Sequence, residues 1–131
     1  MSYSNPQTVT ITTGAILTTA AAATMALRGP KGKTGRLVDV IARASVANHA
    51  LGTTTPTTLL VGKAGDTDAY ATFFPAAMTI PTATALTDDP GASNIVGIDI
   101  PADTVVLLTT VANNGGSPTG TITYDVIIDW F

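Results

Sequence analysis

The chain has 131 residues, a formal net charge of −3 and no cysteine. One domain with a core of its own is therefore expected, whereas a disulfide framework and a thiolate metal site are excluded. The straight-chain helix formers are nearly absent, since there is no Glu, one Gln and three Lys, while 25 Thr, 20 Ala, 12 Gly and 8 Pro favour strands separated by turns.

Residues 1–7 are uncharged, and we expect them to form a flexible arm ahead of a single domain over residues 8–131. No signal peptide is expected, because the start has neither a charged region nor an apolar run; with no disulfides, this favours synthesis in a cytoplasm. A short strand is predicted at 8–12. The Ala-rich segment 15–27 is ambiguous between helix and strand, and we favour a strand from about residue 22 to 27.

A basic loop follows, "RGPKGKTGR" (28–36), which we call the basic turn. It holds four of the six cations, namely Arg28, Lys31, Lys33 and Arg36. Its Gly-Lys-Thr ending is that of a phosphate-binding P-loop, but the first glycine of that motif would be residue 27, which is Leu27, and a strand pattern follows instead of a helix. We therefore predict a turn that joins strands 22–27 and 36–46 as a hairpin.

Charge is unevenly distributed along the chain. Residues 1–63 carry all six cations and one Asp, whereas residues 64–131 carry eight Asp and no cation. A basic loop could thus meet an acidic loop on a neighbouring copy. Only 11% of the residues are charged, well below the usual quarter, which suggests that partners cover much of the surface.

The remaining strands are predicted from alternation of apolar and polar residues. They lie at 57–62, 69–74, 94–100, 104–112 and 121–131. In the strand at 36–46, one face is predicted to hold Val38, Val40, Ala42, Ala44 and Val46. In the last strand, one face is predicted to hold Ile122, Tyr124, Val126, Ile128 and Trp130.

Two further expectations concern the last strands. Arg43, on the other face of 36–46, is a candidate to pair with Asp125 or Asp129, and the Gly-rich link 113–120 is predicted to be a hairpin loop. Together the segments predict an all-β, antiparallel β-sandwich of seven or eight strands, with jelly-roll or immunoglobulin-like wiring both open.

Catalytic groups are scarce, and no enzyme activity, cofactor or metal is expected. His49 is the one histidine and is interpreted as a loop or surface residue, because no nucleophile or carboxylate is placed beside it by sequence spacing. Asp66 and Asp68 could hold Ca²⁺, but a turn is the simpler interpretation since no Glu is available to complete a calcium loop. Nucleic-acid binding is not expected, because no aromatics interleave with the basic turn.

Tyr70, Phe73 and Phe74 are a candidate exposed aromatic cluster. Such a cluster could bind sugars, so a glycan- or receptor-binding module of a phage fibre or bacterial surface is kept as the alternative function.

The stretches "LRGPKGKTGRLVDV" (27–40) and "TTLLVGKAGDTDAY" (57–70), with residues 100–131, resemble small virion proteins of tailed bacteriophages. These are jelly-roll or related β-sandwich proteins of the capsid decoration (cement) type, and similar sandwiches serve as head-fibre or adaptor pieces. The resemblance covers most of the chain and includes no catalytic signature.

The resemblance implies a structural subunit, often a homotrimer, on the capsid exterior after synthesis in a host cytoplasm. Its partners would be the major capsid protein and copies of itself, with no nucleic acid and no membrane. The residues expected to touch the acidic capsid surface are Arg28, Lys31, Lys33 and Arg36.

Overall fold

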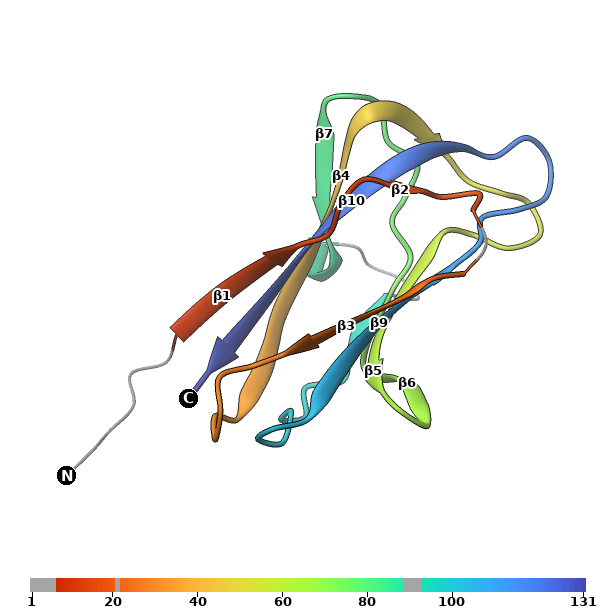
Figure 1. Ribbon diagram of the computed structural model, residues 1–131. Coiled ribbons are helices and arrows are strands. Elements are labelled where there is room, and N and C mark those ends of the chain that lie inside the picture. The colour runs from red at the N-terminus through yellow and green to blue at the C-terminus, as the bar shows by residue number, and fades with distance from the viewer. Residues whose placement is uncertain (1–6, 21, 89–92) are drawn as a thin grey trace.

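A computed structural model describes residues 7–20, 22–88 and 93–131. Two antiparallel sheets pack against each other as a β-sandwich (Figure 1), which confirms the predicted all-β sandwich. The elements are β1 (Gln7–Thr12), β2 (Ile16–Leu17), β3 (Thr24–Arg28), β4 (Gly35–Ala50), β5 (Thr58–Lys63), β6 (Asp66–Phe73), β7 (Thr82–Ala85), the 3₁₀ helix η1 (Leu86–Asp88), β8 (Asn94–Ile95), β9 (Val105–Val111) and β10 (Thr119–Trp130).

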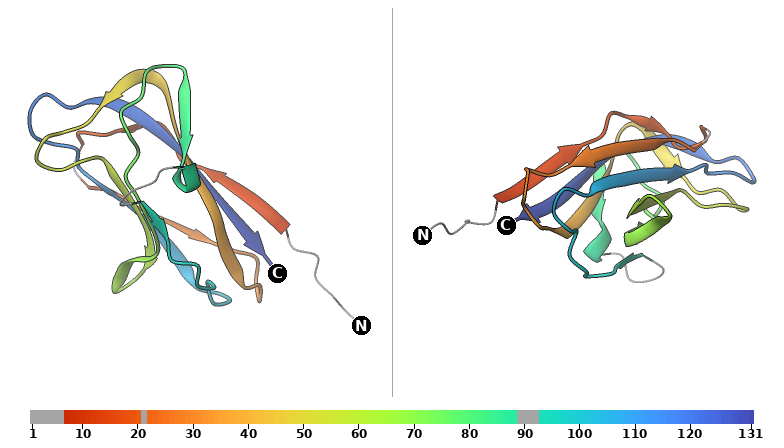
Figure 2. Two further views of the ribbon diagram at one scale, coloured as in Figure 1. Left: turned by 180° about the vertical axis from the view of Figure 1, so that it is seen from behind. Right: turned by 60° about the horizontal axis from the view of Figure 1, so that its bottom comes forward.

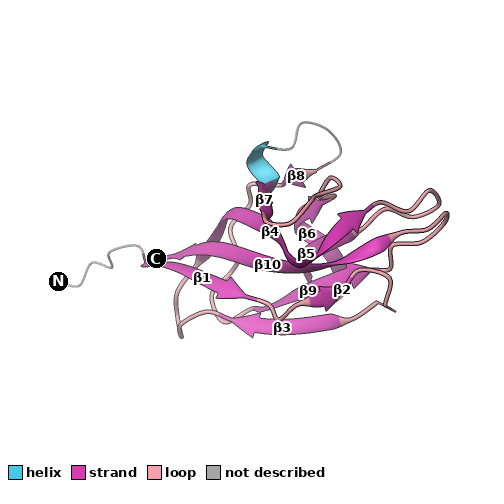
Figure 3. Cartoon of the chain, turned by 90° about the horizontal axis from the view of Figure 1, so that it is seen from above, coloured by secondary structure: helices cyan, strands magenta, loops and turns pink. Residues whose placement is uncertain are grey.

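The first sheet has the strand order β1-β10-β4-β7, with β2 also paired to β10, and the second has the order β3-β9-β5-β6-β8. Figure 2 shows the two layers from behind and from below. In the view from above, β1, β10 and β4 lie side by side (Figure 3). The predicted arm falls largely on residues 1–6, outside the described residues, while Gln7 already pairs with Trp130.

The core lies between the sheets and is built by the alternation of apolar residues. On β10 the predicted inner face is confirmed, since all five of its residues are buried: Ile122, Tyr124, Val126, Ile128 and Trp130. They face the second sheet, where Phe73 meets Tyr124 edge to face with ring centroids 6.3 Å apart. Full burial of one such apolar side chain stabilises the fold by about 1.5–3 kcal/mol.

A β-bulge changes the inner face of β4. Ile127 pairs with Asp39 and the next residue, Ile128, pairs with Leu37. Val38, between Leu37 and Asp39, therefore has no partner of its own on β10. Leu37 is consequently buried and Val38 is 42% exposed. The prediction that Val38 shares the buried face was therefore wrong, although Val40, Ala42 and Ala44 do lie in the core; the side chain of Val46 lies outside the described residues.

Both predicted hairpins were wrong. β3 pairs with β9 in the second sheet, whereas β4 belongs to the first, so the basic turn crosses between the layers. The link 113–120 likewise carries the chain from β9 to β10 in the opposite sheet. Alternation fixes which face of a strand is buried, but it does not say whether a short loop bends back in one sheet or spans the ~10 Å between two.

Two further strand predictions are corrected by the structure. The strand expected at 94–100 is limited to Asn94–Ile95, with one isolated bridge between Ile100 and Gly35. The edge strand β7, with the sequence TATA, was not predicted, because it lacks the large apolar residues that mark a strand.

Candidate functional site

The basic turn is built around the indole of Trp130, which is 3% exposed. A Cβ atom on Gly29 would lie 2.4 Å from ring atoms of Trp130, and one on Gly35 would lie 2.6 Å away. The two ends of the basic turn therefore pass so close to the ring that only glycine fits. Sequence reasoning missed this contact, because nothing in the pattern connects these glycines to a residue near the other end of the chain.

Backbone hydrogen bonds hold the base of the basic turn on two sides. Thr34 and Phe131 exchange a pair of N–H···O bonds of 2.9 Å each. The N–H of Gly35 donates to the carbonyl of Ile100 over 2.9 Å, and the N–H of Ile100 donates back over 2.7 Å. The basic turn, which joins β3 to β4 in Figure 1, is thus fixed by hydrogen bonds to the end of β10 and to the loop before β9.

Two of the four predicted contact residues have acidic partners within the chain. Arg28 lies 3.3 Å from a carboxylate oxygen of Asp103, and Arg36 lies 2.6 Å from one of Asp99. A hydrogen bond from the N–H of Gly32, followed in importance by Arg28, lowers the pKa of Asp103. These pairs are exposed, so each contributes little to stability.

Lys31 and Lys33 lie at the tip of the basic turn, with Lys31 exposed and Lys33 half-buried. Among the described residues neither forms an ion pair. A strand follows the basic turn, as predicted, so the helix that a P-loop requires is not there. What the basic turn offers is a fixed loop with two lysines available to an acidic surface.

The predicted exposed aromatic cluster was wrong. Tyr70 is 2% exposed and Phe73 is 0% exposed, because Phe73 packs into the core against Tyr124. Phe74 is half-buried, and its N–H donates to the hydroxyl of Ser93. These three residues therefore offer no exposed platform on which a sugar could stack.

His49 is also placed differently from its prediction, since it is a buried residue near the end of β4 and is 2% exposed. Its Nδ1–H donates to the carbonyl oxygen of Ala76 over 3.1 Å, and its Nε2 accepts from the hydroxyl of Thr57 over 2.7 Å. Burial lowers the pKa of His49, partly offset by the bond to Ala76. The imidazole is therefore neutral at physiological pH.

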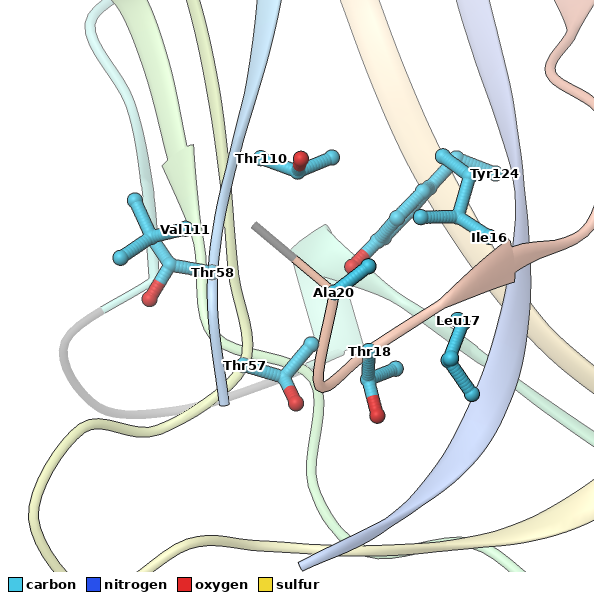
Figure 4. A pocket seen from close by; sticks show the side chains of 9 residues that line it. All are labelled: Ile16, Leu17, Thr18, Ala20, Thr57, Thr58, Thr110, Val111 and Tyr124. Carbon is cyan, nitrogen blue, oxygen red and sulfur yellow. The ribbon is translucent and has the colours of Figure 1, made fainter. Parts of the chain in front are cut away.

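A hydroxyl bonded to a histidine could act as a nucleophile, but Thr57 is only 3% exposed, and a carbonyl rather than a carboxylate orients the ring. Thr57 also borders the hollow of Figure 4, into which the hydroxyl of Tyr124 points. The hollow has room for about one water molecule. The lining hydroxyls of Thr18, Thr58 and Thr110 already donate to backbone carbonyls.

Asp66 and Asp68 are exposed at the start of β6, which follows a tight turn after β5. In the described parts of the chain, no three His, Asp or Glu side chains come together in a way that could hold a metal ion. Within the same residues there is no helix with the length and hydropathy to cross a membrane.

Comparison with known proteins finds no family model, no curated protein and no solved structure that matches this chain.

Proposed function

We propose that this protein is a structural virion protein that binds the outside of a major capsid shell and stabilises it. The observation that carries the proposal is the basic turn, whose ends pack against Trp130 and whose Lys31 and Lys33 form no ion pair within the described part of the chain. A loop that is already ordered loses little conformational entropy when it docks, and its charge favours an acidic surface.

The outward face of the second sheet supports the proposal, because its middle carries no charge. The outward positions there include Leu60, Thr72, Leu107 and Thr109. Charged residues of this sheet gather at one end, at Arg28, Lys63, Asp66 and Asp68. The first sheet differs, since its outward face carries charges along its length. An uncharged, partly apolar face suits contact with a shell or with another copy.

The order of the eight longer strands supports jelly-roll wiring of the kind that the resemblance implies. With β2 and β8 set aside, the first sheet contains the first, eighth, third and sixth long strands, and the second contains the second, seventh, fourth and fifth. This order arises when one long antiparallel hairpin is rolled into two layers, as in a jelly roll. A homotrimer remains part of the proposal, and the mass of the protein in solution tests it.

The proposal predicts that the purified protein co-sediments with undecorated capsids of a tailed bacteriophage at micromolar concentration. Lys31→Glu combined with Lys33→Glu should weaken this binding by about tenfold or more, which corresponds to about 1.4 kcal/mol. The melting temperature should be unchanged, because neither lysine contributes an ion pair or core contact in the described fold.

Lys63→Glu is the matched control for Lys31→Glu alone, since each variant reverses the charge of one exposed lysine and Lys63 lies on the β5–β6 hairpin. It should leave capsid binding close to that of the wild type. Failure of the folded wild-type protein to co-sediment would remove the proposal, and equal weakening by both variants would assign the effect to net charge instead of the basic turn.

The glycan-binding alternative loses its main support, because Tyr70 and Phe73 are buried. A location on the capsid exterior, after synthesis in a host cytoplasm, follows from the proposed function.

A further inference from the structure

The segment at residues 75–81 joins β6 of the second sheet to β7 of the first, and the end of β4 holds it in place. His49 and Met78 exchange backbone hydrogen bonds, with 2.8 Å from the His49 N–H and 3.0 Å from the Met78 N–H. The side-chain oxygen of Asn48 accepts from the N–H of Ile80 over 2.9 Å. The segment that leads into β7 is thus held to β4 by contacts made around His49.

The His49 ring reinforces this junction, because it bonds to two further segments at once. Nδ1–H donates to Ala76 in the 75–81 segment, and Nε2 accepts from Thr57, which directly precedes β5. The neutral imidazole, with its proton on Nδ1, satisfies both bonds. A second proton would lie on Nε2 and turn this atom into a donor, so it could no longer accept from Thr57. The Thr57 hydroxyl would have to rotate and accept instead.

Among the residues that the structure describes, no acidic side chain acts on His49 to stabilise an imidazolium. The neighbouring segments 51–58, 74–81 and 112–120 contain no Asp, Lys, Arg or Tyr, and β7 is TATA. Arg43, farther along β4, is paired with Asp125. Tyr124 lines the hollow beside Thr57, but burial raises its pKa far above neutrality, so it is uncharged. A proton on His49 would therefore be an uncompensated buried charge.

We propose that His49 is an acid-sensitive latch, and that its protonation releases residues 75–81 and the edge strand β7 from β4. Release is local because β7 is an edge strand that pairs, as far as the described residues show, with β4 alone, through four residues from Ile41 to Ala44. The inference goes beyond the proposed function and does not depend on it, since the latch can be measured on the isolated protein.

The pKa of His49 gives the direction of the effect. The folded protein holds this pKa below the ordinary 6.5, so the open form binds the proton more readily. The closed form is fully favoured above pH 6.5, and its advantage falls as the pH is lowered toward the folded pKa. At pH 5.5 the opening equilibrium should rise by up to about tenfold relative to pH 7.5.

Hydrogen exchange of residues 76–85, corrected for the intrinsic pH dependence of exchange, measures that equilibrium. Strand β9, in the middle of the second sheet, serves as the internal reference and should keep its protection. In parallel, the single imidazole signal in the NMR spectrum gives the pKa of His49 directly, because the chain has one histidine. A His49 pKa of 6.5 or above, or equal loss of protection in β9, would overturn the latch.

His49→Gln is the matched variant, because Gln has a donor and an acceptor but does not titrate in this range. Exchange at 76–85 should then be the same at both pH values. If the variant does not fold, the wild-type exchange and NMR titration still decide: unchanged protection at 76–85 at pH 5.5 contradicts the inference.

Discussion

Trp130 is the one tryptophan of the chain, and its ring determines which residues can form the ends of the basic turn. The alternation of β10 predicted correctly that Trp130 lies inside. It could not predict that Gly29 and Gly35 lie against the ring, because alternation specifies a face and not the partner across the core. The same limit explains why His49 was expected at the surface, since its burial depends on Ala76 and Thr57.

Gly35→Ala is predicted to destabilise the protein. The new Cβ atom would lie 2.6 Å from the Trp130 ring, so either the ring or the backbone must move. Overpacking of this kind costs about 1–3 kcal/mol. Urea unfolding should show the loss as a lower midpoint with an unchanged slope.

Gly14→Ala provides the control, because a Cβ atom at that position meets nothing within 4 Å. Its free energy of unfolding should stay the same or rise slightly, since alanine restricts the unfolded chain. Equal losses in the two variants would show that Trp130 is not the cause.

Strand β10 is the central element of the first sheet, paired with β1 and β2 on one side and β4 on the other. Two consecutive residues of β10, Ile127 and Ile128, differ in environment. Ile128 is 0% exposed, whereas Ile127 is half-buried on the outward face. One strand thus offers two isoleucines with opposite orientations.

Ile128→Ala is predicted to lower the free energy of unfolding by about 2–5 kcal/mol, because it removes core contacts and leaves a cavity. Ile127→Ala, its matched control, should cost about 1 kcal/mol or less. Chemical denaturation of both variants measures the difference. Similar losses would mean that β10 has a different register from the one described here.

Strands with strong alternation were predictable at this scale, and their connections were not. The bulge at Val38 depends on a one-residue mismatch between β4 and β10, which neither segment reveals alone. The basic turn and the link 113–120, which cross between the sheets, contain Gly and Pro, and this composition is equally typical of hairpin loops.

At the scale of the whole molecule, the uneven charge of the sequence is partly balanced inside one chain. Each of the three described ion pairs joins a cation of residues 1–63 to an acid of residues 64–131: Arg28–Asp103, Arg36–Asp99 and Arg43–Asp125. The Arg43–Asp125 pair confirms the prediction from the sequence that Arg43 pairs with Asp125 or Asp129. Charge counts alone could not distinguish pairing within a chain from pairing between copies, because that depends on how the two halves interleave.

The sandwich is predicted to unfold as one cooperative unit above pH 7, because residues of both sheets contribute to one continuous core. Trp130 fluorescence reports on one end of the first sheet, whereas far-UV circular dichroism reports on all strands. The two signals should give the same midpoint in urea. Separate midpoints would show that the sheets can come apart individually.

The place of β10 between β1 and β4 has a consequence for biosynthesis. Until β10 has left the ribosome, β1 and β4 lack the strand that lies between them, and one edge of β4 stays unpaired. Non-local pairing of this kind also slows folding. The newly made chain therefore passes through a period in which apolar strands are exposed before β10 is available to pair with them, and chaperones have most reason to act then.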